Sequence, residues 1–417
     1  MHKIKQLVPQ SLKNLYHFGL AFLANVFYGF PSHKIKVIGV TGTNGKTTTV
    51  QMITKVLEEG GYKVAMASTI NFKIGAKQWV NATKYTTLSP FAVQKFIRQA
   101  VKEGCAYLVL ETSSHALDQF RVWGIAYDTA VITNVTREHL DYHGTMEKYR
   151  LAKAKLFQKA KTAIVNADME KPEEFLQFSN EKKITYGVRN KADIKAENVE
   201  LGISGSTFNV QLATFSLVLP GMFNVENALA AICVGICEDI PLQTTVRALE
   251  KITGIPGRME TVENEKGLNI IVDYAVTPDS LEKLYGLLGG AKEAGAKTIA
   301  VFGSCGDRDR GKRPLMGEIV SRHADYVIVT NEDPYYEDPQ QIIDEVAGGV
   351  KNKKEGEDFW KIPDRREAIA KALSLAQEGD LVVVTGKGAE ETMAIADQRI
   401  PWNDRKVIER ELAKLGV

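Results

Sequence analysis

A glycine-rich loop carries the first residues whose types and spacing suggest chemistry. Residues 41–48 read Thr-Gly-Thr-Asn-Gly-Lys-Thr-Thr and follow a short apolar run of strand type. A loop of this kind, placed between a strand and a helix, offers backbone N–H groups and a helix N-terminus to a phosphate. Lys46 is then expected to reach the β- and γ-phosphates of a nucleotide, and Thr47 to bind Mg²⁺. Val40 stands where the strict pattern has a glycine, so the loop has a shorter form that begins at Gly42.

A carboxylate, Glu111, follows a second apolar run at residues 107–110. Ligands bind at the carboxyl ends of parallel strands, so a carboxylate at that edge can hold Mg²⁺. A surface glutamate at a strand end is an equally good interpretation of Glu111 taken alone. The phosphate loop likewise leaves a kinase, a GTPase or a motor open beside a ligase.

The elements that must position these residues alternate between strand and helix. Such alternation predicts a mainly parallel sheet that is covered on both faces. In the first part we expect strands at 35–40, 64–67, 106–110 and 129–132, and helices at 46–59, 90–103 and 224–237. Residues 184–219 have short β patterns and polar turns, which predict a strand-rich insertion. After the Gly-Ile-Pro-Gly linker at 254–257 we expect strands at 269–272, 298–302, 326–330 and 381–385, and helices at 279–288 and 339–346.

These patterns predict an α/β protein in which a parallel-sheet ATPase domain with a phosphate loop precedes a Rossmann-like α/β domain. The expected boundaries are an apolar N-terminal segment at 1–34, the ATP-binding domain at 35–254 and the C-terminal domain at 255–417. A chain of 417 residues is long enough for two or three domains.

The composition excludes several classes of protein. A net charge of +2 gives no electrostatic footprint for nucleic acid, so we expect no such partner. None of the four cysteines belongs to a Cys-x-x-Cys pair, which argues against a zinc or thioredoxin-type site and fits a reducing cytoplasm.

The first 31 residues contain an apolar and aromatic stretch at 15–30, with His17 and Asn25 inside it. The stretch is shorter than the roughly 20 residues that a transmembrane helix needs. A helix packed on the body or on a partner protein is favoured, a helix lying on a membrane surface is the second alternative, and a true span is the least favoured. We therefore expect a cytoplasmic protein that has a peripheral membrane or protein contact through residues 1–31 as an open alternative.

A series of short motifs runs through the chain in a fixed order. They are VTGTNGKTTT (40–49), ETSSHALDQFRV (111–122), TNVTREHLDYHGTMEKYRLAKAKLF (133–157), NVENALAA (224–231), GRME (257–260), DYAVTPDSLE (273–282), GDRDRGKRPLMG (306–317) and GKGAEE (386–391). In this order the chain resembles the Mur ligase family, and within it the UDP-N-acetylmuramyl-tripeptide synthetases. The resemblance covers about residues 35–405.

The resemblance implies an ATP-dependent, ADP-forming ligase that works on a muramyl-peptide-type cell-wall precursor. A substrate carboxylate would be phosphorylated, and an amino acid would then attack the acyl phosphate. The matching catalytic positions are Lys46, Glu111, His139, Lys153 and Arg258. Two Mg²⁺ ions would be held by Thr47, Glu111, His139 and Lys153. The nucleotide contacts would be Gly42, Thr43, Asn44, Gly45, Lys46, Thr47, Thr48, Asn227, Arg258 and Asp273.

Lys153 matches the family lysine that is carbamylated. Carbamylation would convert its cationic side chain into a carboxylate-like anion that can bind Mg²⁺. Lys155 in the same YRLAKAKLF string is a competitor for this role, and the spacing from Tyr149 favours Lys153.

The resemblance also implies where the carboxylate substrate lies. Its contacts would be Thr86, Thr87, Ser113, Gln119 and Arg121, which match residues that hold the sugar-peptide and its diphosphate. The phosphate loop begins at residue 41, where full-length synthetases first have a uridine-binding domain. We therefore expect that domain to be missing, and a shorter carrier, a lipid-borne carrier or a partner protein to replace its contribution.

The amino-acid side departs from the family pattern. Family members that select meso-diaminopimelate have an Asp-Asn-Pro-Arg motif, and this chain reads Glu-Asp-Pro-Tyr at 332–335. The expected amino-acid contacts are Arg308, Asp333, Tyr335, Gly386 and Glu390. Arg308 would bind the α-carboxylate, and the two acidic residues would favour a cationic side chain such as that of lysine. Val276 and Ala389 replace two family histidines.

Two other functions stay open beside a cell-wall ligase. An amide ligase on another acceptor, similar to folylpolyglutamate or cyanophycin synthetases, would share the same core. A nucleotide-dependent binding protein without catalysis is the third alternative, and the matching catalytic positions argue against it.

Overall fold

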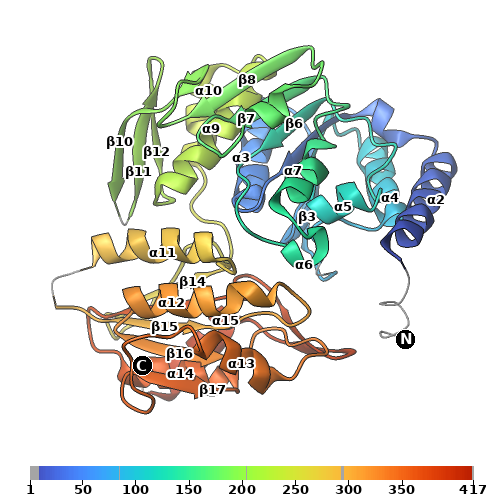
Figure 1. Cartoon of the computed structure of the whole chain (residues 1–417). Coiled ribbons are helices and arrows are strands. Elements are labelled where there is room, and N and C mark those ends of the chain that lie inside the picture. Colours follow the sequence, from blue (N-terminus) through green and yellow to red (C-terminus); the bar gives the residue numbers. More distant parts are fainter. Residues whose placement is uncertain (1–8, 84, 203, 293–294, 416–417) are drawn as a thin grey trace.

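The computed structural model describes residues 9–83, 85–202, 204–292 and 295–415, and these form two lobes around separate β-sheets (Figure 1). The upper lobe in that view holds a nine-stranded and a three-stranded sheet. The lower lobe holds a six-stranded sheet and a two-stranded hairpin. Both large sheets are mainly parallel with helices on their faces, which confirms the predicted α/β class.

The nine-stranded sheet brings the ends of the phosphate-loop strand and the Glu111 strand together. In sheet order its strands are β4 (Lys77–Val80), β3 (Asn71–Ile74), β2 (Val64–Ala67), β5 (Tyr107–Glu111), β1 (Lys36–Thr41), β6 (Thr129–Ile132), β7 (Thr162–Asn166), β8 (Lys182–Gly187) and β9 (Ile194–Lys195). All pairs from β2 to β9 are parallel, and only β3 and β4 are antiparallel additions. Val40 pairs with Glu111, so the carboxylate lies directly beside the start of the loop.

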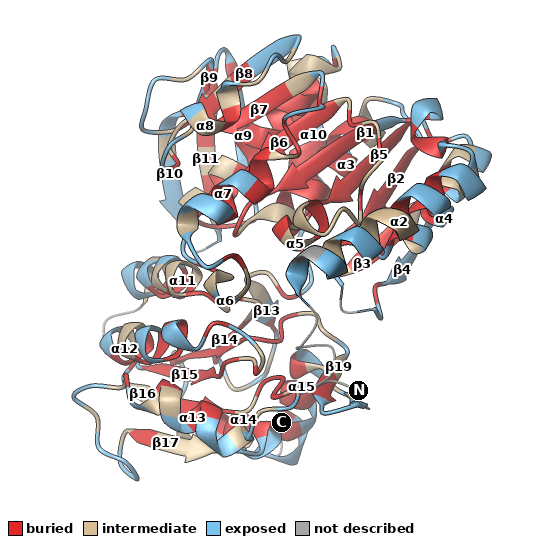
Figure 2. Ribbon diagram, turned by 45° about the vertical axis from the view of Figure 1, so that its right-hand side comes forward, coloured by how far each residue is buried: buried red, intermediate tan, exposed pale blue. Residues whose placement is uncertain are grey.

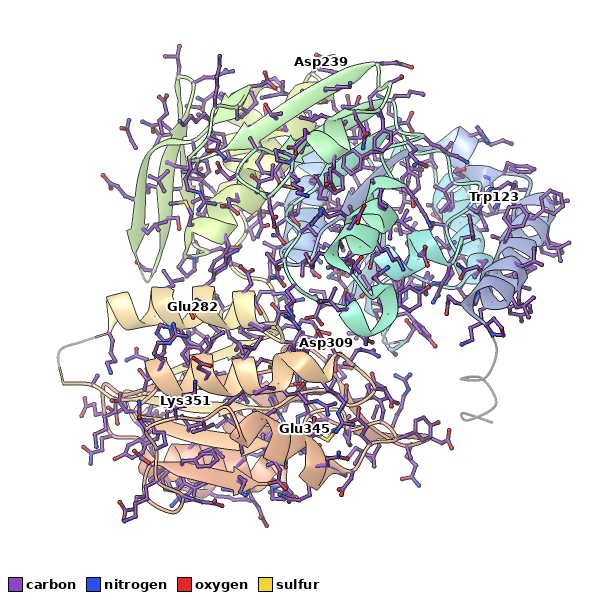
Figure 3. All side chains as sticks on the ribbon, viewed as in Figure 1. Trp123, Asp239, Glu282, Asp309, Glu345 and Lys351 are labelled. Carbon is purple, nitrogen blue, oxygen red and sulfur yellow. The ribbon has the colours of Figure 1, made fainter. Side chains whose placement is uncertain are left out.

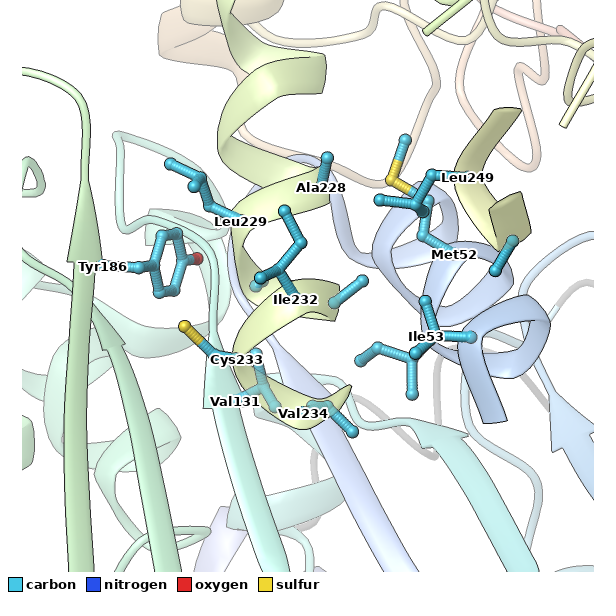
Figure 4. Close-up of a cluster of buried hydrophobic side chains, with 14 of the residues drawn as sticks. Met52, Ile53, Val131, Tyr186, Ala228, Leu229, Ile232, Cys233, Val234 and Leu249 are labelled. Atoms are coloured by element: carbon cyan, nitrogen blue, oxygen red, sulfur yellow. The ribbon is translucent and has the colours of Figure 1, made fainter. Parts of the chain in front are cut away.

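Helices cover both faces of this sheet because apolar side chains alternate along its strands. Val37 belongs to one buried cluster and Ile38 to the other. Helices α3 (Lys46–Glu59), α9 (Met222–Cys237) and α10 (Leu242–Glu250) contribute to the Ile38 cluster, part of which is drawn in Figure 4. Helices α4 (Pro90–Lys102), α5 (Ser114–Asp118) and α7 (Met146–Ala154) contribute to the Val37 cluster. The short helices α6 (Leu140–His143) and α8 (Glu173–Leu176) lie beside α7.

The predicted insertion at 184–219 is only partly an insertion. β8 and β9 fall in its first part, and they extend the large sheet rather than leaving it. Only β10 (Glu197–Gly202), β11 (Gly205–Val210) and β12 (Ala213–Leu217) form a separate antiparallel sheet. The first strands have the same short, alternating pattern as the later ones, so periodicity alone did not separate them.

The lower lobe repeats the sandwich arrangement with a new sheet. In sheet order its strands are β13 (Glu260–Val262), β14 (Asn269–Asp273), β18 (Leu381–Thr385), β15 (Thr298–Phe302), β16 (Tyr326–Thr330) and β17 (Phe359–Ile362). The helices on one face are α11 (Pro278–Ala291), α12 (Arg313–His323) and α13 (Pro339–Ala347), and those on the other are α14 (Arg365–Leu375) and α15 (Asp404–Lys414). A hairpin of β19 (Thr392–Ile395) and β20 (Gln398–Pro401) follows β18.

The apolar N-terminal segment forms helix α2 (Gln10–Tyr28), which packs on α4 at the edge of the upper lobe (Figure 1). Residues 1–8 of the segment lie outside the described residues. Among the helices that are described, none combines the length and the apolar character needed to cross a bilayer.

A buried ion pair fixes the loops at the carboxyl ends of β16 and β18 in the lower lobe. Arg365 and Asp404 are both fully buried and form two hydrogen bonds, of 2.8 and 2.7 Å. The guanidinium also donates to the carbonyl oxygens of Thr385 and Asn331, at the ends of β18 and β16. The pair therefore ties α15 and α14 to the two loops that carry residues 331–335 and 386–390.

We expect Asp404→Ala to destabilise the lower lobe by about 3–5 kcal/mol, because removal of one partner leaves a buried charge uncompensated. The measurement is the midpoint of thermal unfolding of the full chain. The double variant Asp404→Leu/Arg365→Met should recover much of the loss, since it removes both charges. An Asp404→Ala midpoint close to that of the wild type would contradict this account of the pair.

Candidate functional site

A cavity lies between the two lobes, at the carboxyl ends of β1, β5 and β6, and it is lined by residues from both lobes. The label of Asp309 in Figure 3 marks this junction. The upper lobe contributes residues 43–48, Thr69, Thr86, Glu111, Asn134, Glu138, His139, Asn224 and Asn227. The lower lobe contributes Arg258, residues 273–277, Asp279, Arg308, Lys312, Asp333, Tyr335 and Glu390.

The phosphate loop keeps its shape because glycine is required at two positions. Gly42 and Gly45 have φ angles of +150° and +82°, and a Cβ at either would collide with a neighbouring side chain. The nearest atoms would be Oγ1 of Thr133 at 1.9 Å and Oδ1 of Asn227 at 2.3 Å. Lys46 begins α3 and donates from Nζ to the carbonyl oxygen of Thr43 at 2.8 Å. Burial lowers the pKa of Lys46, and the Glu111 carboxylate opposes that shift.

Glu111 is buried beside the first turn of α3 and is surrounded by donors. Its Oε2 accepts from Thr47 Oγ1 at 3.1 Å and from the backbone N of Thr69 at 2.7 Å. Its Oε1 accepts from Thr69 Oγ1 at 2.9 Å. The side chains of Thr47 and Glu111 thus meet at one point next to the loop, where both offer oxygen to a cation.

His139 and Lys153 lie on the other side of the loop. His139 has a left-handed backbone (φ +57°), its buried Nδ1 has no hydrogen-bond partner, and burial holds its pKa well below the ordinary value. Lys153 is buried, donates from Nζ to the carbonyl oxygen of Gly42 at 2.7 Å and lies 4.4 Å above the ring of Tyr149. Burial and then the charge of Lys46 lower the pKa of Lys153.

Lys155 lies elsewhere. Its Nζ is bound to Asp118 Oδ1 at 2.7 Å, and its side chain is about one-third exposed. Of the two lysines that the sequence left in competition, Lys153 is therefore the one beside the phosphate loop.

The side chains around the phosphate loop suit Mg²⁺ better than a metal ion that protein side chains must coordinate completely. Among the described residues, no three His, Cys, Asp or Glu side chains are grouped closely enough to hold a metal. Mg²⁺ commonly takes one or two carboxylates and completes its shell with water and substrate phosphates. Thr47, Glu111 and a neutral His139 next to a phosphate loop fit that pattern.

Arg258 reaches the loop from the lower lobe. Its Nη2 donates to Thr47 Oγ1 at 3.4 Å, and its guanidinium lies 4.5 Å above the ring of Tyr274. Asp273 accepts from the backbone N of Met259 at 2.7 Å and of Ala275 at 2.8 Å, so its carboxylate also holds the loops beside Arg258 in place.

Further contacts close the two lobes over the cavity. Asn44 of the phosphate loop donates to Asp279 Oδ2 at 2.9 Å. Lys312 donates to Glu138 Oε1 at 2.9 Å and to the carbonyl oxygen of Val276 at 2.8 Å. The Lys312–Glu138 pair is almost completely buried, and burial raises the pKa of Glu138. Val276, which departs from the family, therefore serves the site through its backbone.

The residues expected to bind the carboxylate substrate gather near the end of β5. The hydroxyl oxygens of Thr86 and Thr69 lie 3.2 Å apart, and Thr87 Oγ1 donates to the carbonyl oxygen of Glu111 at 3.0 Å. Ser113 caps α5, whose last turn is followed by Gln119. Arg121 donates from Nη1 to the carbonyl oxygen of Thr87 at 2.9 Å, and its buried Nε has no partner.

Of the residues expected to bind the amino acid, Arg308, Asp333, Tyr335 and Glu390 line the cavity from the lower lobe. The Arg308 guanidinium lies 5.4 Å from the ring of Tyr335, and its Nη1 donates to the carbonyl oxygen of Asp307 at 3.0 Å. Gly386 does not line the cavity; it has φ +112°, and a Cβ there would lie 2.8 Å from Glu332 Oε2.

Lys387 adds a positive charge next to Asp333 and Glu390, which were expected to make this part of the site acidic. It is fully buried, and its Nζ donates to Asp333 Oδ1 at 2.8 Å and to Glu390 Oε2. The two acidic residues are therefore partly neutralised from within the protein. A third carboxylate, Glu332, is buried beside them, accepts from Cys305 Sγ at 2.8 Å and has an Oε2 without a partner. Burial raises the pKa of Glu332, which opposes ionisation of this carboxyl group.

Several residues at the cavity were not singled out from the sequence. They are Thr69, Glu138 and Lys312, which line the cavity, and Glu332 and Lys387, which are buried beside its lining residue Asp333. All except Thr69 lie in or beside the motifs given above, so they could have been found from their closeness in sequence to a candidate residue. Thr69 had no such signal, because it follows β2 in a loop of ordinary composition.

Comparisons with known proteins assign both lobes. Residues 40–235 match a family model described as the Mur ligase middle domain, and residues 257–388 match one described as the Mur ligase, glutamate ligase domain. The chain is 42% identical over 420 residues to a UDP-N-acetylmuramyl-tripeptide synthetase from Roseiflexus sp. (strain RS-1), which covers 95% of this chain and 82% of that protein. It is 42% identical over 398 residues to a UDP-N-acetylmuramoyl-L-alanyl-D-glutamate--2,6-diaminopimelate ligase from Syntrophomonas wolfei, covering 93% and 80%.

Solved structures give the same result. A UDP-N-acetylmuramoyl-L-alanyl-D-glutamate--2,6-diaminopimelate ligase aligns with a TM-score of 0.61 and 35% identity, over 92% of this chain and 79% of that one. A folylpolyglutamate synthase from Mycobacterium tuberculosis in complex with ADP aligns with a TM-score of 0.72, over 88% and 91%. At 18% identity the second likeness concerns the fold alone.

Proposed function

Because the chain belongs to the Mur ligase family, we propose that it joins a cationic amino acid to a carboxylate of a muramyl-peptide-type precursor. The chain is an ATP-dependent, ADP-forming amide ligase of peptidoglycan precursor synthesis, and its substrates are small molecules. In the proposed reaction a carboxylate oxygen attacks the γ-phosphorus of ATP and ADP leaves. The amino group then attacks the acyl carbon, and phosphate leaves with the electron pair of the C–O bond.

The arrangement of Lys46, Thr47, Glu111 and Arg258 around one loop carries this proposal. Phosphoryl transfer of this kind requires mainly positioning and neutralisation of charge. Lys46 and Arg258 approach the loop from different lobes and supply positive charge to the phosphates. Closure of the lobes brings Arg258 to Thr47 and excludes water from the acyl phosphate.

ATP and Mg²⁺ are required by the family chemistry, in which the metal neutralises charge on the transferred phosphoryl group. We assign one ion to Thr47 and Glu111, whose oxygens meet beside the loop. We assign a second ion to His139 and a carbamylated Lys153. A neutral imidazole nitrogen without a partner supports this assignment on the His139 side.

The acceptor is assigned to the end of β5. Thr86, Thr87, Ser113 and Gln119 offer neutral donors there, and Arg121 offers a cation with an unused N–H. Such a set suits a phosphorylated sugar-peptide, since arginine binds phosphate through two parallel hydrogen bonds.

The amino acid is assigned to the part of the cavity that the lower lobe lines. Arg308 would bind its α-carboxylate, because its guanidinium lines the cavity beside Tyr335. Asp333, Tyr335 and Glu390 would surround the side-chain end, and Gly386, outside the cavity, would act through the loop that carries Glu390.

The experiment that tests the function is a screen of phosphate release. All twenty common amino acids, meso-diaminopimelate and ornithine should be tested with UDP-linked and with free muramyl peptides. Release that requires both a muramyl peptide and an amino acid is expected. Release only with a folate-type or other acceptor, or no release with any acceptor, would contradict the proposal.

We expect meso-diaminopimelate to be a poor substrate beside lysine. Tyr335 occupies the position of the family arginine that pairs with the distal carboxylate, and a buried carboxylate without a partner costs about 1–3 kcal/mol or more. The carboxylates of Asp333 and Glu390, which line the cavity, add repulsion. The measurement is a direct competition at equal concentrations, with products resolved by mass spectrometry.

Two variants sharpen that competition. Tyr335→Arg should raise the share of diaminopimelate, and Tyr336→Arg, at the exposed neighbouring position, is the matched control that should not. Preferred incorporation of diaminopimelate by the wild type would contradict the assignment of Tyr335. Preference for a neutral amino acid would contradict only the role given to the acidic residues.

A further inference from the structure

The outer side of α2 carries an exposed apolar stripe. Its residues recur at helical spacing of three and four, so they lie on one face of the helix. They are Leu12, Leu15, Tyr16, Phe22, Leu23, Val26 and Phe27, continued by Phe30 after the helix and by Phe91 at the start of α4, and we call this set the apolar stripe. Phe27 is 74% exposed and packs edge-on against Tyr28, with Phe91 6.4 Å away.

The opposite side of α2 is fixed to the body, so the apolar stripe does not turn inward. Ala21 and Ala24 are buried, and Phe18 lies 5.0 Å from the ring of Trp123. Asn25 is fully buried and donates to the carbonyl oxygen of Trp123 at 2.8 Å. Figure 3 shows Trp123 beside α2, and Figure 2 shows the outer face of the helix as exposed. The inner side of the helix is therefore apolar and packed, and its outer side is apolar and exposed, with no other element of the described residues covering it.

An exposed continuous apolar surface of this kind marks a site of interaction rather than a random surface residue. The charged residues at the border of the apolar stripe indicate what kind of surface covers it. Lys95, Arg98 and Lys102 follow Phe91 along the same face of α4, and Lys34 follows α2. The first acidic residue in the sequence is Glu58, so no acidic residue belongs to α2 or to the residues before it.

We propose that the apolar stripe docks α2 on the surface of a bilayer that contains anionic lipids. Aromatic and aliphatic side chains would enter the boundary between headgroups and acyl chains, and the lysines and arginine of the border would face the lipid phosphates. A second copy of the chain fits less well, because two such faces would bring their basic borders together. A helix that lies in the interface also agrees with the finding that α2 is not apolar enough to cross the bilayer.

Docking through α2 has a consequence for the acceptor, and this step alone rests on the proposed function. The loop that packs against α2 through Phe120 and Trp123 also carries Gln119 and Arg121. Gln119 and Arg121, which are assigned to the acceptor, would then lie on the side of the upper lobe that faces the lipid. A precursor held on a lipid carrier could reach it without leaving the surface.

Flotation with unilamellar vesicles tests the proposal on the full chain. We expect it to float with vesicles that contain phosphatidylglycerol, and to float weakly with vesicles of phosphatidylcholine alone. The double variant Leu23→Gln/Phe27→Gln should lower the bound fraction by at least about tenfold. Lys95→Gln/Lys102→Gln should lower binding by about fivefold for each lysine and reduce its dependence on salt.

Matched controls lie on the far side of the upper lobe. Leu212→Gln removes an exposed leucine at the turn between β11 and β12, and Lys191→Gln removes an exposed lysine between β8 and β9. Both should bind vesicles as the wild type does. All variants should keep the wild-type unfolding midpoint and the phosphate release seen with water-soluble substrates, so failure of docking can be told apart from failure of the proposed reaction.

Three outcomes would overturn the proposal. One is absence of wild-type binding to anionic vesicles, and another is equal binding by Leu23→Gln/Phe27→Gln. The third is a stable dimer of the wild type, seen by light scattering, that this double variant abolishes while vesicle binding is absent. That result would assign the apolar stripe to a second copy of the chain.

Discussion

Lys46→Ala and Glu111→Ala are each expected to lower the rate of ATP-dependent amide formation by at least about a hundredfold. Lys46 is the cation that begins α3 beside the phosphate loop, and its loss would leave the transferred phosphoryl group without a charge partner. Glu111 meets Thr47 at the loop, so its loss would remove the carboxylate assigned to Mg²⁺. The measurement is phosphate release at saturating ATP, precursor and amino acid.

Two controls separate this effect from a loss of structure. Lys55→Ala removes a half-exposed lysine from the same helix, and it should leave the rate unchanged. Glu111→Gln keeps the shape and the acceptance of hydrogen bonds at one oxygen while removing the charge. It should be as slow as Glu111→Ala with a wild-type unfolding midpoint. A rate above about a tenth of wild type in Lys46→Ala or Glu111→Ala, a barrier change below about 1.4 kcal/mol, would contradict the assignment.

Much of the fold follows from local patterns in the sequence. The strand predicted at 129–132 and the helix predicted at 46–59 have the bounds that the structure gives to β6 and α3. Both are flanked by clear signals, since the helix begins at a glycine-rich loop and ends at a pair of glycines. Elements with weaker signals, such as the hairpin of β3 and β4, were not predicted, because neither of these four-residue strands has an apolar run.

The residues of the site also divide into those that a local sequence pattern could predict and those that it could not. Residues next to a strand end or a glycine-rich loop could be placed from the sequence, and Glu111 and Lys46 do lie together. The charge of the amino-acid end could not be predicted, because it depends on Lys387, which is close to Glu390 in sequence but far from Asp333. In the sheet, β18 lies beside β15, and β15 lies beside β16. This strand order brings together the loops that follow β16 and β18.

Helix α2 shows a different limit. Its sequence is apolar on nearly every side, so periodicity could not separate the face that packs from the face that is exposed. The structure makes that division through Asn25 and Trp123, whose hydrogen bond fixes the rotation of the helix. A polar residue inside an apolar run thus decided which face of the helix is left exposed.

A protonated Lys153 would add positive charge beside the proposed Mg²⁺ site, and burial opposes that protonation. Its side chain is buried, and burial together with Lys46 holds its pKa well below the ordinary value of a lysine. A neutral amine can attack CO₂, which forms an N–C bond and releases one proton. The product is a carbamate whose oxygens carry a negative charge next to the phosphate loop.

We therefore expect Lys153→Ala to lose about 10²–10³-fold in rate, the usual cost of removing one group that stabilises charge in the transition state. Short-chain carboxylates such as acetate or propionate should restore part of the activity, because they can occupy the space of the missing carbamate, and bicarbonate should restore less. Lys155→Ala is the matched control and should keep the wild-type rate, since that lysine is bound to Asp118. A crystal structure with metals bound should show density for a carbamate beyond Nζ of Lys153. An unmodified Lys153 that points to solvent in that structure, or a variant that no carboxylate rescues, would count against carbamylation.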